Sequence, residues 1–404
     1  MSETTESSRK KYLTNNMLKK SALTVLIIII FYIVITPFRM VGHGLEAAEV
    51  PPVSISAGVD ISFAVTDDGD LWAWGFNSPG QLGTEWRRNQ LHPIKIKSDV
   101  ATVFSSNARF MWSSSNGQSM IITSNGDLWL LGLDVRRSTN IRTLLVNTPT
   151  KIMENVIDVS LGGGHAMAIT SDNTLWGWGY NRYGQVGNDG PRWVQRPRRI
   201  MEDVIAVSAG DNHTMAITSD GTLWGWGWNT FGQLGLGITE DKHRPVKIME
   251  NVVATSTGIG NTMAITVDGD LWTWGRDGSE GGLRQGWLGD ATFEDRHSPA
   301  KIKSNVVAVV ADPSAMAITA DGTLWAWGEN SLGSLGDGTT EHRPIPVKIM
   351  TDVVSISRGS THTMALRTDG SLWGWGTNRF GQLGDGTTEN RHYPIKIMEG
   401  VYVP

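Results

Sequence analysis

A seven-fold internal repeat constrains this 404-residue chain more than any other feature. A Leu-Trp pair, which opens the motif L-W-x-W-G in most copies, recurs with its tryptophan at positions 72, 129, 176, 224, 272, 325 and 373. The commonest spacing is 48 residues, and longer intervals of 57 and 53 residues precede Trp129 and Trp325. Repeats of this length are typical of propellers and solenoids, in which each copy is one supersecondary unit.

Each copy predicts four short strands separated by turns. In the copy that begins at Val204, these strands are 204–209, 213–218, 223–227 and 245–248. This pattern is typical of a propeller blade. The last copy stops just inside what would be an eighth first strand, and the chain enters the same strand near Pro52 and Val53. We therefore expect seven whole blades with adjacent chain ends.

A two-residue turn is predicted between the second and third strands of every copy. The pairs are Asp68-Gly69, Asn125-Gly126, Asp172-Asn173, Asp220-Gly221, Asp268-Gly269, Asp321-Gly322 and Asp369-Gly370. A type I′ turn needs positive φ at both central residues, which Asp, Asn and Gly tolerate best. We therefore expect type I′ hairpins, and a calcium site at the acidic run 67–70 is the alternative interpretation.

Tryptophan and glycine are unusually abundant, with 18 and 47 residues, and cysteine is absent. Without disulfides, the stability of the fold must come from a large core. The two tryptophans of L-W-x-W-G lie at i and i+2, so they point to the same face of a strand. We expect them to pack blade against blade, each contributing on the order of 4–6 kcal/mol as an upper bound.

Two phrases recur in fixed order over about residues 53–400: D-G-x-L-W-x-W-G-x-N-x-x-G-Q-L-G and V-S-x-G-x-x-H-T-M-A-I. They resemble the RCC1 (regulator of chromosome condensation) repeat family. The resemblance implies an all-β fold, a seven-bladed β-propeller of RCC1-type repeats over residues 53–404. The family contains a chromatin-binding nucleotide exchange factor for a small GTPase, scaffolds and a plant ultraviolet receptor. The receptor's G-W-R-H-T motif is absent here, and the second copy lacks G-Q-L-G, so the resemblance supports the fold better than any one function.

An apolar stretch precedes the repeats. Residues 1–21 form a basic cytoplasmic region, residues 22–41 one hydrophobic helix, and residues 42–52 a linker. The charge-free run within 22–41 has a length between those of a signal-peptide core and a spanning helix, so a signal anchor and a cleaved signal peptide both stay open. Because basic residues precede it, either interpretation places the propeller outside the cytoplasm, membrane-anchored through 22–41 or secreted.

Histidines recur at two places in the repeat. Three copies carry one at the start of the second strand: His165, His213 and His362. The other copies carry Ile61, Gln118, Asn261 and Ser314 there, so we expect local hydrogen bonds rather than a metal ring. A second set is expected in solvated loops before the fourth strand: His92, His243, His297, His342 and His392. No nucleophile elbow, carboxylate-pair motif or H-E-x-x-H motif occurs, so the sequence predicts neither an enzyme nor a metal or cofactor.

Binding residues are expected where copies depart from the repeat. The second copy has three arginines where G-Q-L-G should be, and the fifth inserts residues 278–285. Arg and Trp are enriched at binding hot spots, and an arginine cluster suits an acidic partner. The predicted ligand-binding residues are Arg136, Arg137, Arg142, Arg284 and Trp287.

The leading hypothesis is an exported, cell-surface or secreted propeller that acts as a non-catalytic binding or scaffold module for a protein or polysaccharide. The net charge of −5 argues against nucleic acid as the partner. The alternative, implied by the resemblance, is a regulator of a small GTPase similar to a guanine-nucleotide exchange factor. A secreted hydrolase is the third hypothesis.

Overall fold

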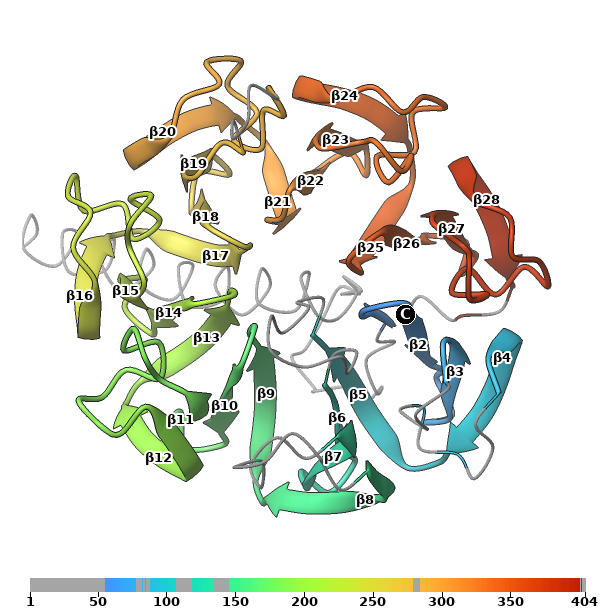
Figure 1. Cartoon of the computed structure of the whole chain (residues 1–404), viewed down its shortest axis with the longest axis horizontal. Helices are drawn as coiled ribbons and strands as arrows, with labels where there is room; N and C mark the ends of the chain where they lie inside the picture. The colour runs from blue at the N-terminus through green and yellow to red at the C-terminus, as the bar shows by residue number, and fades with distance from the viewer. Residues whose placement is uncertain are drawn as a thin grey trace, which may run out of the picture.

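The computed structural model describes residues 55–77, 82, 84, 88–106, 118–133, 145–278, 284–399 and 401. Over these residues the chain forms seven four-stranded antiparallel sheets arranged as a ring (Figure 1). The seven-bladed all-β propeller expected from the repeat is therefore confirmed. The segments 1–21, 22–41 and 42–52, with the predicted hydrophobic helix, lie outside the described residues.

Each blade is built from one continuous stretch of chain. The strands are, from blade 1 to blade 7, β1 Ile55–Ala57, β2 Ile61–Val65, β3 Leu71–Gly75, β4 Gln90–Lys97; β5 Val100–Ser105, β6 Ser119–Thr123, β7 Leu128–Leu133, β8 Leu145–Met153; β9 Val156–Leu161, β10 His165–Thr170, β11 Leu175–Tyr180, β12 Trp193–Met201; β13 Val204–Ala209, β14 His213–Thr218, β15 Leu223–Gly227, β16 Lys242–Met249; β17 Val252–Thr257, β18 Asn261–Thr266, β19 Leu271–Gly275, β20 Arg296–Lys303; β21 Val306–Val310, β22 Ser314–Thr319, β23 Leu324–Gly328, β24 Arg343–Met350; β25 Val353–Arg358, β26 His362–Arg367, β27 Leu372–Gly376, β28 Arg391–Met398. The first strand of each blade lies nearest the centre and the fourth forms the outer wall (Figure 1). The predicted strands of the fourth copy match β13, β14 and β15 residue for residue, whereas β16 extends beyond the predicted 245–248.

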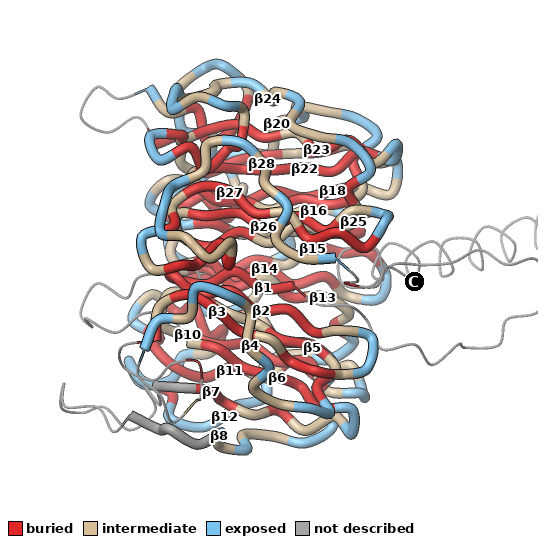
Figure 2. The backbone as a smooth tube through the Cα atoms, turned by 90° about the vertical axis from the view of Figure 1, so that its right-hand side faces the viewer, coloured by how far each residue is buried: buried red, intermediate tan, exposed pale blue. Residues whose placement is uncertain are grey.

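The second strand of each blade has no solvent-exposed face. In β14, the first five residues of the sequence HTMAIT are all buried. This strand lies between two others in its own sheet and is also packed between neighbouring blades, so an unbroken run of apolar and small residues suits it. The buried residues form layers through the ring, while the exposed residues lie in the loops, in the turns and along the outer fourth strands (Figure 2).

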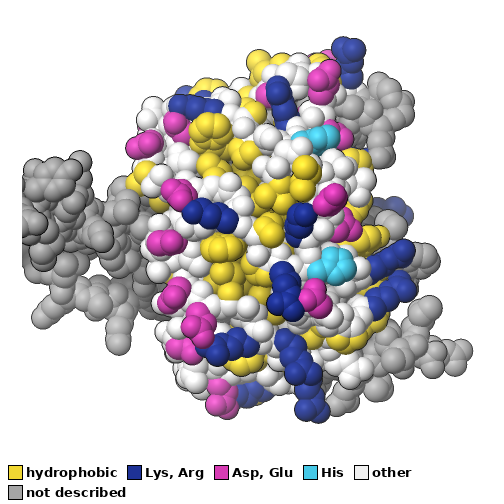
Figure 3. Space-filling model, turned by 90° about the vertical axis from the view of Figure 1, so that its left-hand side faces the viewer, with side chains coloured by type: hydrophobic (Ala, Val, Ile, Leu, Met, Phe, Trp, Pro, Cys, Tyr) yellow, Lys and Arg dark blue, Asp and Glu magenta, His cyan; other side chains and the backbone are white. Residues whose placement is uncertain are grey.

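The fourth strand of each blade is a sheet edge that could pair with another chain. Every one of these strands contains a proline: Pro93, Pro149, Pro197, Pro245, Pro299, Pro346 and Pro394. A proline has no N–H to donate and therefore weakens an edge as a template for further pairing. On the side of the ring shown in Figure 3, charged side chains flank a band of hydrophobic ones. The outer wall thus combines two features that oppose edge-to-edge association.

The hairpin between the second and third strands differs from the predicted turn. Between β14 and β15, Gly221 N donates to Thr218 O at 2.9 Å, and Thr218 N donates to Thr222 O at 3.0 Å. Gly221 has a positive φ of 78°, whereas Asp220 does not have a positive φ, and the same holds for the corresponding pair in all seven copies. The type I′ prediction is therefore wrong. The left-handed residue ends a four-residue turn, as in a type I turn followed by a bulge.

The aspartate of this pair stabilises the turn through its side chain rather than through the left-handed backbone conformation that was predicted. The Asp220 carboxylate accepts hydrogen bonds from the Thr218 hydroxyl at 2.7 Å and from Thr222 N at 3.0 Å. These bonds hold the pKa of Asp220 below its usual value. The carboxylate therefore fixes the turn through its side chain, and no left-handed backbone is required of it.

Replacing Gly221 with valine is expected to destabilise the fold by more than about 1 kcal/mol, because a β-branched residue is strained at positive φ. A Cβ at Gly221 would be 3.6 Å from the nearest atom, so the effect is conformational rather than steric. Gly221→Asn is the matched control, since Asn173 occupies the same turn position with a φ of 60°. Urea denaturation measures both variants, and equal stability of the two would contradict the argument.

The ring closes without a strand shared between its two ends. β1 and β28 belong to different sheets, each complete in four strands. Val401, just after the last strand, is buried in one hydrophobic cluster with Ile55 and Ala57 of β1. The predicted adjacency of the start of the first blade and the end of the last blade is therefore confirmed. Closure depends on contacts between blades 7 and 1, which repeat those between other blades.

Candidate binding face

Two sets of loops emerge at the same end of the ring, and we call this end the loop face. One set joins the first and second strands of each blade, and the other joins the third and fourth strands. In blade 4, Trp228 N, which follows β15, donates to Asn212 O, which precedes β14, at 2.8 Å. Residues from both loop sets therefore lie side by side here.

The G-Q-L-G loops on this face connect each blade to the next. The indole N–H of Trp226 in blade 4 donates to the carbonyl of Gln185 in blade 3 at 3.0 Å. The same joint recurs as Trp274 to Gln233 O, Trp327 to Trp287 O, Trp375 to Ser334 O and Trp74 to Gln382 O. The last of these crosses from blade 7 to blade 1. The ring is therefore closed between blades 7 and 1 by the same tryptophan-to-carbonyl hydrogen bond that joins the other blades.

The glycines of this motif allow one blade to approach the next closely. A Cβ added at Gly187 would lie 2.9 Å from Nε1 of Trp226, and one added at Gly184 would lie 2.4 Å from the Cα of His243. Both neighbours belong to blade 4, whereas the glycines belong to blade 3. The motif thus serves the joint between blades as well as the tight turns predicted from the sequence.

Three buried histidines form part of the same joints. His213 Nε2 lies 2.9 Å from the Thr262 hydroxyl of the next blade. That hydroxyl donates its single proton to Gln233 O at 2.8 Å, so His213 Nε2 must be the donor. Burial lowers the pKa of His213 to about 3, so the imidazole is neutral near pH 7. His165 with Thr214 and His362 with Ser62 repeat the arrangement. The predicted local bond is therefore wrong, because the bond crosses to the next blade.

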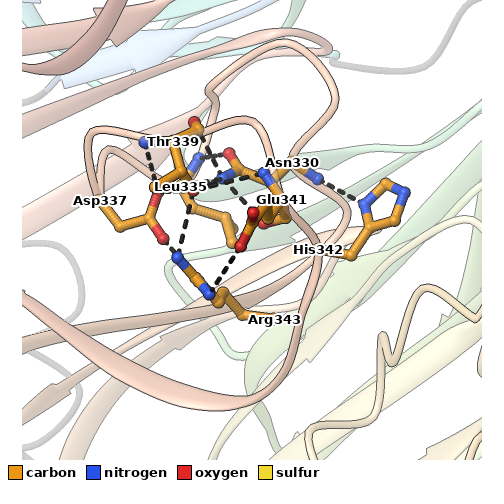
Figure 4. A network of polar contacts seen from close by, with 7 residues as sticks. All are labelled: Asn330, Leu335, Asp337, Thr339, Glu341, His342 and Arg343. Carbon is orange, nitrogen blue, oxygen red and sulfur yellow. Dashed lines mark hydrogen bonds and ion pairs between the residues drawn. The ribbon is translucent and has the colours of Figure 1, made fainter.

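The asparagine of N-x-x-G-Q-L-G fixes the shape of each loop. In blade 6, the buried Asn330 side chain accepts from Leu335 N at 2.9 Å and donates to Asp337 Oδ1 at 3.1 Å (Figure 4). Arg343 pairs with the same aspartate at 2.6 Å. His342 Nδ1 accepts from Asn330 N at 3.0 Å, so this member of the second histidine set holds the loop. The other four members lie on the fourth strands rather than before them: His92, His243, His297 and His392.

A cavity of about 620 Å³ is formed on the loop face by residues of blades 3 to 7. Its wall includes the apolar side chains of Leu161, Ile259 and Trp287. The charged residues of the wall are Asp211, Asp312, Glu329 and Arg358. Arg358 and Asp312 form an ion pair at 2.5 Å, with 2% and 7% of their side chains exposed. The cavity therefore combines an apolar surface with an excess of carboxyl groups.

The structure describes two of the five predicted ligand-binding residues. Trp287 lines the cavity, and the Arg276 guanidinium lies 5.2 Å from its ring centroid. Trp287 stands where other copies have the glutamine of G-Q-L-G, so its carbonyl also serves the joint to Trp327. Arg284 lies over the ring of Phe293 at 5.3 Å. The remaining three lie outside the described residues: Arg136, Arg137 and Arg142.

Sequence reasoning missed a row of aromatic side chains that runs across blades 3 and 4 toward this cavity. Neighbouring ring centroids are 5.2 to 6.5 Å apart. Arg276 connects the last ring, Phe231, to Trp287 in the cavity wall. The row consists of Trp193, Tyr180, Tyr183, Trp228 and Phe231. Its signal in the sequence was an aromatic residue directly after W-x-W-G in these two copies, Tyr180 and Trp228.

Metal ligands and membrane-spanning helices can be assessed for the part of the chain that the structure describes. Within it, no group of three or more His, Asp or Glu side chains is placed to hold a metal ion. No helix in the same ranges has the length and apolar character needed to cross a membrane.

This chain is a β-propeller whose blades are joined through contacts between tryptophans and G-Q-L-G loops. Its candidate site is a cavity on the loop face. The family model described as the RCC1-like domain matches residues 35–311 and 131–403. The chain belongs to this family, and the resemblance noted in its repeats is confirmed.

Curated relatives match only part of the chain. The ultraviolet-B receptor UVR8 of Arabidopsis thaliana is 30% identical over 138 residues, which cover 33% of this chain and 30% of the receptor. The human E3 ubiquitin-protein ligase HERC2 is 30% identical over 148 residues, covering 35% of this chain and 3% of the ligase. The matched stretch thus spans less than a third of either relative.

Solved structures share the fold at lower identity. Prp20p from Saccharomyces cerevisiae, studied for its binding to Gsp1p and histones, has a TM-score of 0.65 at 20% identity, over 77% of this chain and 81% of that chain. Human WBSCR16 has a TM-score of 0.55 at 21% identity, over 92% of this chain and 90% of that chain. These similarities establish the architecture of the propeller.

Proposed function

We propose that this RCC1-like propeller is a non-catalytic binding module that engages a protein or polysaccharide partner through its loop face. The observation that carries the proposal is the cavity of about 620 Å³, in which apolar and charged side chains from five blades converge. Concave sites with a largely apolar lining and a few polar groups are the usual form of a binding pocket.

A protein partner is favoured over a polysaccharide. Ile259 is 37% exposed and belongs to the cavity wall, and the aromatic row reaches the same wall through Arg276. Apolar, aromatic and arginine side chains at the centre of a patch are the composition of a protein–protein hot spot. The binding of Prp20p to Gsp1p and histones, although it belongs to that protein, is consistent with this choice.

Export of the propeller is part of the proposal and rests on the sequence of residues 1–41. A reporter fused to the C-terminus should be found outside the cytoplasm, because basic residues precede the apolar segment. A cytoplasmic reporter would contradict export. It would instead favour the second candidate function, the regulation of a small GTPase.

Ile259→Arg in the full-length protein is expected to weaken capture of the partner by about tenfold or more, because a charge would enter the apolar part of the site. Ile345→Arg is the matched control, since Ile345 is 53% exposed but lies on the outer wall in β24. Quantitative capture from surface extracts compares the two variants with the parent. Equal capture by all three proteins, or repeated failure of the parent to capture anything, would reject the loop face as the binding site.

A further inference from the structure

We propose that the cavity on the loop face binds a lysine or arginine side chain of the protein partner, with the Asp211 carboxylate as its counter-ion. This inference rests on the proposed function, because it names the chemistry by which the loop face would hold that partner. The proposed site is acidic and binds a basic group. The sequence had instead predicted that arginines of this chain bind an acidic partner.

Asp211 differs from the other two carboxyl groups of the wall, since Asp312 pairs with Arg358 and Glu329 accepts a hydrogen bond from Ser331 N. Among the described residues, the Asp211 side chain makes no hydrogen bond and no ion pair. Arg358 is the one cation among the described wall residues, and it is already bound to Asp312 at 2.5 Å and to the Ser314 hydroxyl at 2.8 Å. The described residues therefore supply no cation to Asp211, and a positive group of the partner would take that place.

The repeat does not require a carboxyl group at this position. Asp211 is the second residue of the loop between β13 and β14, and most other copies place uncharged residues there: Val59, Gly163, Ile259 and Ser360. Blade 6 has Asp312, whose charge is balanced by Arg358. A partly buried acid without a partner destabilises a fold unless it is neutralised, so the structural role of the loop does not account for Asp211.

The electrostatics of the wall favour a cation. Burial, together with the nearby charge of Asp312, raises the pKa of Asp211 to about 7. A bound ammonium or guanidinium would reverse this effect, so binding should release a proton and strengthen as the pH rises. The other titratable groups of the wall are Asp312, Glu329 and Arg358. Behind the wall, His165 and His213 have pKa values of about 3 and remain neutral over this range.

The apolar part of the wall fits the stem of a long basic side chain. Lysine and arginine carry a flexible hydrocarbon chain that packs along apolar surface while the charged head meets its partner. Leu161, Ile259 and Trp287 supply such a surface in the same cavity as Asp211. A small inorganic cation would leave this surface unused. The combination therefore selects a basic side chain.

The test uses three blocked tripeptides, with lysine, arginine or norleucine between two glycines, and measures their binding to the full-length protein by saturation-transfer NMR. The lysine and arginine peptides are expected to bind with dissociation constants of about a millimolar, and the norleucine peptide about tenfold more weakly. Asp211→Asn should weaken binding of the charged peptides by about tenfold, whereas Glu202→Gln, the same loss of charge at an exposed ion pair with Arg199, should not.

The pH dependence provides a second readout. Between about pH 6 and pH 8, the affinity of the parent for the lysine peptide should rise about tenfold, and that of Asp211→Asn should stay constant. The melting temperature of Asp211→Asn at about pH 8 should equal or exceed that of the parent, because a carboxyl with a raised folded pKa opposes folding once it ionises. A lower melting temperature would make Asp211 a structural residue and overturn the inference.

Three other results would overturn it as well. They are equal binding of the norleucine peptide, binding of butylammonium without binding of the peptides, and absence of any peptide binding. The outcomes remain distinct from those of the proposed function. If Ile259→Arg abolishes partner capture while the peptides do not bind, the loop face stands and the basic-residue site falls. If capture is also unaffected, both are rejected.

Discussion

Trp226→Ala is expected to lower the free energy of unfolding by about 3–5 kcal/mol, the range for removing a fully buried large aromatic side chain. Trp226 has no exposed surface, belongs to the hydrophobic cluster between blades 3 and 4, and donates its indole N–H to Gln185 O. Its removal therefore leaves a cavity and removes one hydrogen bond across a joint of the ring, so that Gln185 O keeps only its bond from the Thr214 hydroxyl. Urea denaturation followed by tryptophan fluorescence measures the change.

Trp224→Ala is the matched control, two residues away on the same strand. Trp224 is only partly buried, and its indole N–H bonds to Thr218 Oγ1 within its own blade at 3.2 Å. We expect it to lose clearly less stability than Trp226→Ala, because less surface is uncovered and no joint between blades is broken. Similar losses for the two variants would refute the distinction between the two tryptophans.

The fold could be predicted from the sequence because its signal is local and repeated seven times. Strand limits in the fourth copy follow from residue alternation between turn residues, and they match β13 to β15. The turn type could not be obtained in this way. Asp220 and Gly221 suit a type I′ turn as residue types, but the Asp220 side chain bonds to Thr218 and Thr222 and favours a longer turn. The hydrogen bonds of the Asp220 side chain therefore determine the turn type.

The contacts between blades could not be predicted from the sequence of a single repeat. The pattern L-W-x-W-G places both tryptophans on one face, but it does not say that Trp226 reaches the next blade while Trp224 stays at the margin. The bond from His213 to Thr262 likewise joins residues 49 positions apart, beyond the length of one copy. Such pairs depend on the rotation of one blade relative to the next, which the ring determines.

The candidate site was predictable only in outline. Departure from the repeat correctly drew attention to Trp287, which lies in the cavity wall. Asp211 was missed because it departs from most of the other copies at only one position, within a loop of normal length. Comparing the same loop position across all copies, where uncharged residues predominate, is the signal that would have found it.

Acid is expected to destabilise the propeller through its three buried histidines. His165, His213 and His362 have folded pKa values of about 3, well below the value of about 6.5 in an unfolded chain. A group with a lowered pKa of this kind adds stability above the unfolded pKa and loses it as the pH falls, because the unfolded state then binds more protons. Between about pH 7 and pH 5, each histidine should remove about 2 kcal/mol from the free energy of unfolding.

Three carboxyl groups act in the opposite direction. Burial raises the pKa values of Asp158 and Asp211 to about 7 and also raises the pKa of Asp312, so each opposes folding less as the pH falls. The pH profile of the parent is therefore a balance, and the histidine contribution must be isolated by comparison. The triple variant His165→Asn, His213→Asn and His362→Asn does so, since Asn261 fills this position in blade 5.

The asparagine variant should be less stable than the parent at neutral pH, because it loses the three bonds between blades. On moving from about pH 7 to pH 5, however, it should lose about 6 kcal/mol less stability than the parent does. Urea denaturation at the two pH values measures both differences. Equal pH dependence of parent and variant would mean that the folded histidines take up protons as readily as the unfolded ones. The Nδ1 atoms of all three make no hydrogen bond to the described residues, so a proton placed there would be a buried charge without an acceptor.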